Sequence, residues 1–210
     1  GTDGTWTHAV PLIHTQLASD GRLSVSTGDI SQNWVQGIDV AVSTVRPVDK
    51  IDIQSAPLVF VGFGASAPER NWDDYGEIDL TGKIAIFLVN DPDFSANESE
   101  PVWGRFGNKR MTYYGRWAYK YEEAARRGAL AALVIHEDKA AGYGWNVASS
   151  GQEVSLHWLS LVALHHQYCR VGCIMMQRAR CLQRPAWILW NNVDLLEEMT
   201  LVRSSFLKPH

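Results

Sequence analysis

Hydrophobic and polar positions alternate most regularly in the stretch 111–137. At helical spacing, one face carries aromatic and small side chains: Tyr114, Trp117, Ala118, Tyr121, Ala124 and Ala125. The opposite face carries charges: Lys120, Glu122, Glu123, Arg126 and Arg127. The two faces predict an amphipathic helix over about residues 113–127, with acid-to-base pairs four residues apart and Gly128 as its C-terminal cap.

Continuous apolar runs follow and precede this helix. Residues 130–135, 84–89 and 58–63 are each too short for a helix and suit strands buried on both faces. Weaker strand patterns cover 6–15, 22–27 and 35–42. Between the strong runs, residues 91–110 are rich in Pro, Asn, Ser, Glu and Gly and exceed the usual length of a connection. We therefore expect an α+β domain with one main helix and a functional or mobile loop.

Four blocks of this sequence carry a family resemblance. They are APLVFVGFG at 56–64, WDDYGEIDLTGKIAIFLVNDPDF at 72–94, MTYYGRWAYKYEEAARRGA at 111–129 and HEDKAAGYGWN at 136–146. Together they resemble the protease-associated (PA) domain that is inserted in zinc aminopeptidases of the M28 peptidase family. The resemblance covers roughly residues 6–152.

The resemblance implies a swivelling β/β/α fold with an open-barrel or mixed sheet. It also implies a non-catalytic role, in which the insert shapes substrate access or protein contacts beside a separate zinc site. The partners would be a peptide substrate or the catalytic domain of the parent peptidase. Zinc would belong to that parent, which removes N-terminal residues, and not to this chain, which would be inactive alone. Such parent enzymes are often secreted or periplasmic. The sequence of this chain does not itself indicate a cellular compartment.

Composition narrows the classes of function. The chain has 210 residues, 46% hydrophobic and 20% charged, which is typical of a globular protein. A net charge of −4 with mixed signs provides no basic face for nucleic acid, and no apolar run is long enough to span a bilayer. The first residues, GTDGTWTHAV, lack the basic start and apolar core of a signal peptide. We expect neither nucleic-acid nor membrane binding.

The tail 153–210 differs from residues 1–152. It holds all three cysteines and no long helical or strand periodicity. Read one base out of frame, the segment between Gly172 and Leu189 permits LHHDAARALFAAAGLDF, an alanine-rich helix that resembles the segment following the insert in the same family. We therefore expect 1–152 to be a PA-like fragment of a larger peptidase and 153–210 to be a frameshift product, poorly packed or disordered. A genuine divergent extension is the alternative.

Several groups of residues could carry chemistry, but none matches a catalytic motif. His136, Glu137 and Asp138 end a predicted strand, where neighbouring side chains alternate faces and cannot converge on one metal, so a solvated strand end is the simpler reading. The carboxylate pairs 73–74 and 91–93 could bind calcium but more often stabilise turns. We predict no catalytic residue and no metal ligand.

Aromatic residues are concentrated between 103 and 145. Five residues outside the predicted helix core could line a cleft that holds a peptide by stacking and charge pairing: Arg110, Tyr113, Tyr119, Tyr143 and Trp145. We take these as candidate substrate-binding residues. They also suit an alternative function, a free-standing module that binds peptides or glycans through exposed aromatic side chains.

Overall fold

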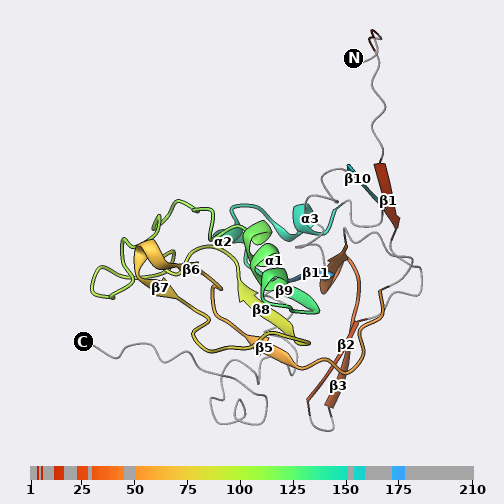
Figure 1. The fold of residues 1–210 in the computed structure, drawn as a ribbon, viewed down its shortest axis with the longest axis horizontal. Helices are drawn as coiled ribbons and strands as arrows, with labels where there is room; N and C mark the ends of the chain where they lie inside the picture. Colours follow the sequence, from red (N-terminus) through yellow and green to blue (C-terminus); the bar gives the residue numbers. More distant parts are fainter. Residues whose placement is uncertain are drawn as a thin grey trace.

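The computed structural model describes residues 4, 6, 12–16, 23–27, 30–44, 51–150, 154–158 and 172–177 (Figure 1). Its centre is a five-stranded sheet in the order β4 (Val40–Ser43), β11 (Gly172–Gln177), β9 (Ala131–His136), β8 (Ile84–Leu88), β5 (Leu58–Phe60). The neighbours β11, β9, β8 and β5 are parallel, and β4 runs antiparallel to β11. The predicted α+β fold is confirmed, and the described strands form a mixed sheet.

The main helix, α1 (Trp117–Arg126), lies against this sheet and contacts β9 most closely (Figure 1). All six residues of β9 are buried, as expected for an apolar run that is covered on both faces. The core between the layers consists mainly of branched and small residues with a few rings: Val59, Leu80, Ala85, Phe87, Ala124 and Leu133.

Smaller elements surround the sheet. The hairpin β2 (Leu23–Thr27) with β3 (Ile30–Trp34) and the pair β1 (Leu12–Gln16) with β10 (Val154–Trp158) are antiparallel. The short strands β6 (Ser66–Ala67) and β7 (Trp72–Asp73) enclose a 3₁₀ turn at Pro68–Arg70. Two single-turn helices, α2 (Asp138–Ala141) and α3 (Trp145–Ala148), follow β9. Of the expected weak strands, 22–27 corresponds to β2 and 35–42 is confined to β4, whereas β3 was not expected. Residues 7–11 of the expected strand 6–15 lie outside the described part of the chain, and β1 includes residues 12–15.

The tail contributes two of the described strands. β11 pairs with β9 on one side and β4 on the other, and β10 pairs with β1, so both pair with strands that precede residue 152. The other residues of 153–210 lie outside the described part of the chain. The proposed division at residue 152, and the frameshift origin of the tail, stay predictions.

Helix α1 begins at Trp117 rather than near Tyr113. Residues 113–115 form a turn, in which the backbone N–H of Arg116 donates to Tyr113 O at 3.2 Å and Arg116 has an extended ψ of 139°. The carbonyl of Gly115 accepts from the N–H of Asn90 at 3.0 Å, so it is held by the loop after β8. This long-range bond ties the chain before α1 to the sheet and is invisible to helical periodicity.

The rotation of α1 about its axis also differs in part from the prediction. Tyr121, Ala124 and Ala125 are buried as expected, and the Glu122–Arg126 and Glu123–Arg127 pairs form. The prediction that Trp117 lies in the core is wrong, because 44% of its surface is exposed. Lys120, assigned to the solvent face, is instead fully buried. The face that meets the sheet is centred on Lys120 and Ala124, which are four residues apart.

The rotation of α1 can be tested by comparing substitutions of a buried and an exposed aromatic residue. Tyr121→Ala should lower the free energy of unfolding by about 3 to 5 kcal/mol, because it removes a buried aromatic ring, whereas Trp117→Ala should cost about 1 kcal/mol or less. Urea unfolding followed by circular dichroism measures both. Equal losses for the two variants would show that the helix is rotated toward Trp117.

Gly64 provides a second test, in the turn after β5. Its φ is +64°, and a Cβ there would lie 2.4 Å from Cδ1 of the buried Phe87. Gly62 has a φ of +73° but open space around its Cβ position, so it is a matched control. We expect Gly62→Ala to cost about 1 kcal/mol from backbone strain, and Gly64→Ala at least 2 kcal/mol more in urea unfolding. Equal costs would mean that Phe87 does not pack against this turn.

Candidate functional site

A buried ammonium group lies where the carboxyl ends of β5 and β8 meet α1. Lys120 Nζ donates to three backbone carbonyls: Phe63 O at 2.5 Å, Asn90 O at 3.1 Å and Tyr114 O at 3.2 Å. We call this arrangement the Lys120 cage. An ammonium has three N–H donors, so the cage satisfies all of them. The three carbonyls come from the turn after β5, the loop after β8 and the turn before α1.

Burial dominates the electrostatics of the cage. It lowers the pKa of Lys120 to about 7, against the effect of Asp91 and Asp74, whose negative charges favour the protonated form. Burial likewise raises the pKa of Asp74 to about 6, although the N–H of Ala65 and the indole N–H of Trp72 both donate to its carboxylate at 2.9 Å. The pKa of Asp91 is also raised by burial.

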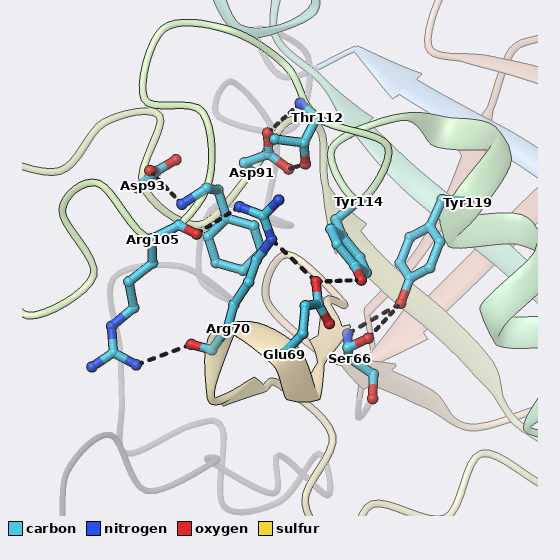
Figure 2. A network of polar contacts seen from close by, with 10 residues as sticks. Ser66, Glu69, Arg70, Asp91, Asp93, Arg105, Thr112, Tyr114 and Tyr119 are labelled. Atoms are coloured by element: carbon cyan, nitrogen blue, oxygen red, sulfur yellow. Dashed lines mark hydrogen bonds and ion pairs between the residues drawn. The ribbon is translucent and has the colours of Figure 1, made fainter.

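Two buried aspartates organise the loop after β8 (Figure 2). Asp91 accepts from the backbone N–H of Thr112 at 2.6 Å and from its hydroxyl at 2.7 Å. Asp93 Oδ2 accepts from the N–H of Phe106 at 2.9 Å and of Asn108 at 3.1 Å. These carboxylates hold turns, as the sequence suggested, but they do so from inside the protein, and both are fully buried.

An aromatic ladder covers one side of this loop. Ring contacts with centroid distances of 5.0 to 6.0 Å connect five residues in the order Trp72, Phe106, Tyr114, Tyr119, Tyr113. Arg70 lies over the rings of Phe106 and Tyr114, at 5.2 and 5.7 Å.

The two arginines beside the ladder form hydrogen bonds within the protein (Figure 2). Arg70 Nη1 donates to Arg105 O at 2.7 Å, and Arg105 Nη1 donates to Asn71 O at 3.0 Å. Glu69 accepts from the hydroxyl of Tyr114 at 2.8 Å and from Nε of Arg70 at 3.2 Å. The ladder and its arginines therefore fasten the loop 91–110 to the turn at Pro68–Arg70.

The five candidate substrate-binding residues fall into two pairs and one outlier. Tyr113 and Tyr119 lie together, with ring centroids 5.4 Å apart. Tyr143 and Trp145 flank the ring of His136, at 5.2 and 5.7 Å. Arg110 is exposed, and the contacts of the described residues do not bring it to either pair. A single cleft lined by all five is not formed by these contacts, and substrate binding by them stays a prediction.

His136 lies in a different environment from the one expected. It is almost fully buried rather than a solvated strand end, and its Nε2 lies 3.1 Å from Asp138 Oδ1. The rings of Tyr143 and Trp145 and the short turn into α2 cover it. Within the described residues, no group of three or more His, Cys, Asp or Glu side chains is arranged to hold a metal ion. The donor set around His136 therefore does not fit a zinc site.

Sequence reasoning missed Lys120, which is the centre of this site. One signal in the sequence indicated its position. Lys120 lies on the same side of the helix as Ala124 and Gly128, which follow it at intervals of four residues, and small residues in such a row are typical of close packing against a sheet. Periodicity weighted by hydrophobicity assigns every lysine to solvent. Its burial is compensated by three carbonyl acceptors, up to 57 residues away in sequence, and by the charges of Asp91 and Asp74.

Comparison with known proteins gives limited information. No model of a protein family and no curated protein matches the sequence. Among solved structures, the chain is similar to an aminopeptidase from Aneurinibacillus sp. strain AM-1, with 16% identity and a TM-score of 0.38. The match covers 86% of this chain and 30% of that protein, so the chain spans less than a third of its length. In the described residues, no helix is long and apolar enough to cross a membrane. The structural neighbour is an aminopeptidase, and the likeness is too distant to assign that activity here.

The pKa of Asp74 is raised and that of the exposed Asp79 is lowered, so the two residues predict opposite pH dependences of stability. Asp74 has a raised folded-state pKa of about 6, so its proton stabilises the fold below its ordinary value of 3.8, and this contribution is lost as pH rises through about 6. Asp74→Asn, which also leaves one buried N–H without its acceptor, should therefore be more destabilising near pH 4 than near pH 7, with a loss of about 1 to 3 kcal/mol at neutral pH.

Asp79 is the matched control for this test. It is exposed, and hydrogen bonds from Thr81 lower its pKa, so its contribution is present at neutral pH and is lost as pH falls. Asp79→Asn should thus be more destabilising near pH 7 than near pH 4. Urea unfolding of each variant and of the wild type at pH 4 and pH 7 measures the change in free energy of unfolding that each substitution causes. If this change depended on pH in the same direction for both variants, the environments assigned to Asp74 and Asp79 would be contradicted.

Proposed function

We propose that residues 6–152 form the non-catalytic protease-associated domain of an M28-like zinc aminopeptidase, in which they shape access of peptides to a zinc site located elsewhere in the parent. The chemistry of peptide hydrolysis would come from that parent. This chain would supply a rigid wall and contact surfaces.

One observation supports this proposal above others: a single hydrogen-bond hub joins all four sequence blocks that resemble the family. Lys120, in the block 111–129, donates to Phe63 O in the block 56–64 and to Asn90 O in the block 72–94. Asn90 Nδ2 in turn donates to Ala140 O, in the block 136–146, at 2.6 Å. Blocks that are scattered over about 90 residues thus specify one buried junction.

The same junction explains how the domain could shape a cleft. It fixes the turn 113–115 in place, which presents Tyr113 with 52% of its surface exposed and its hydroxyl bonded to Glu122. Since the rings of Tyr113 and Tyr119 meet edge to face and the hydroxyl of Tyr119 accepts from the backbone N–H of Ser66, this surface is connected to the sheet through short contacts. A wall of this kind would limit which peptides approach a neighbouring active site.

The alternative is a free-standing module that binds peptides or glycans. The exposure of two large aromatic residues near the start of α1, Tyr113 and Trp117, favours it. The two functions differ in what the isolated chain does. A module binds its ligand alone, whereas an accessory domain requires the catalytic domain to form the cleft.

Two measurements on the purified chain test the proposal. We expect no hydrolysis of aminoacyl-4-nitroanilides with added zinc, and no tightly held zinc by elemental analysis, because the donor set does not fit one. Zinc-dependent hydrolysis with about one zinc per chain, both lost in His136→Ala, would overturn the non-catalytic role.

A binding measurement then separates the two functions. Fluorescence titration with unstructured peptides should show no saturable binding if the chain is an accessory domain. Saturable binding that is weakened at least about tenfold by Tyr113→Ala, but unchanged by Trp103→Ala, would establish the free-standing module instead. Trp103 is a suitable control because it is an exposed aromatic residue outside the aromatic ladder.

A further inference from the structure

The Lys120 cage has the properties of a binding site. Its three acceptors are backbone carbonyls from three separate segments, and they converge on one nitrogen atom that is fully buried. Carbonyl oxygens arranged around a point replace the hydration shell of a monovalent cation. The acceptors belong to the backbone, and the turns that carry them have contacts of their own, so the site is built by the fold and not by the lysine alone.

The contacts of these turns show that the cage is held independently. The turn after β5 is bonded by the hydroxyl of Tyr75, which donates to Gly64 O at 3.0 Å. The loop after β8 is held by Asn90, whose amide reaches Ala140 O and whose backbone N–H donates to Gly115 O. Removal of the lysine side chain would therefore leave the acceptors close to their present positions.

We propose that the cage is a site for a primary ammonium group, and that the side chain of Lys120 is its covalently attached occupant. Burial disfavours a charge at this point, and the negative charges of Asp91 and Asp74 oppose that effect. Their oxygens are already bonded to N–H and hydroxyl donors, from Thr112, Ala65 and Trp72. Carboxylates committed in this way cannot readily join the first shell of a divalent metal ion, which favours hard anionic oxygen ligands. The inference does not depend on the proposed function.

The hydrogen bonds of the site distinguish a primary ammonium from a quaternary ammonium. Three N–H donors match three acceptors, all within hydrogen-bond distance at 2.5 to 3.2 Å. A quaternary ammonium has the same charge but no N–H, so it cannot form these bonds. The free ligand that replaces what Lys120→Ala removes, three carbons and the ammonium, is n-propylammonium.

The test is chemical rescue. Lys120→Ala should lower the melting temperature of the full chain by roughly 10 °C or more, because it leaves three buried carbonyls without donors beside two carboxylates. Addition of n-propylammonium chloride should restore about half of this loss or more in a saturable manner. Tetramethylammonium chloride at the same concentration should not, and neither salt should change Lys139→Ala, which removes an exposed lysine.

A second variant and a second readout keep the test decisive. Lys120→Met fills the cavity with an uncharged chain of similar length, so it should be destabilised and should not respond to n-propylammonium. If Lys120→Ala does not fold on expression, its refolding yield from urea should rise with n-propylammonium and not with tetramethylammonium. The proposal is overturned if Lys120→Met is as stable as the wild type, or if the two salts act equally on Lys120→Ala in both measurements.

Discussion

The burial of one lysine ammonium is the constraint on which the rest of this structure depends. A cation removed from water is costly unless its hydrogen bonds are replaced, and here three backbone carbonyls replace them. The turn after β5, the loop after β8 and the turn before α1, which have hydrogen bonds of their own, must therefore meet at this one nitrogen. The start of α1 at Trp117 and its rotation about its axis both follow from this requirement.

Buried carboxylates extend the same principle to the long loop after β8. Residues 91–116 contain no strand or helix, so their backbone N–H groups cannot be satisfied by regular secondary structure. Asp91 and Asp93 accept four donors from Thr112, Phe106 and Asn108, and thereby replace part of a secondary-structure network. The loop is long, but its position is set by polar contacts in the interior and by the aromatic ladder on its outer side.

These contacts show which polar and aromatic side chains are bonded within the protein and which are exposed to solvent. By charge alone, Arg70 and Arg105 indicate an anion-binding surface, yet their guanidinium groups are bonded to backbone carbonyls of neighbouring turns. Tyr119 likewise contacts other parts of the protein, through its ring contact with Tyr114 and its hydrogen bond with Ser66. Tyr113 is different, because its ring is largely exposed. Tyr113 therefore differs from the arginines and from Tyr119 in keeping about half of its surface accessible.

The sequence alone determined the elements that local pattern controls. Apolar runs located β5, β8 and β9, and the acid-to-base pairs with Gly128 located the end of α1, because periodicity and capping act over a few residues. The blocks that resemble the PA family included every residue of the buried hub, although nothing in their order showed that they meet.

Tertiary structure decided which polar groups are inside. Polar and charged side chains are mostly found at the surface, yet four of them are buried here: Lys120, Asp74, Asp91 and His136. Each is buried because its hydrogen-bond partners lie in segments distant in the chain or in a turn that folds back. Trp117 is exposed for the complementary reason, since the helix rotates to place Lys120 toward its carbonyls. A hydrogen bond depends on distance and angle in space, which a one-dimensional pattern of hydrophobicity does not contain.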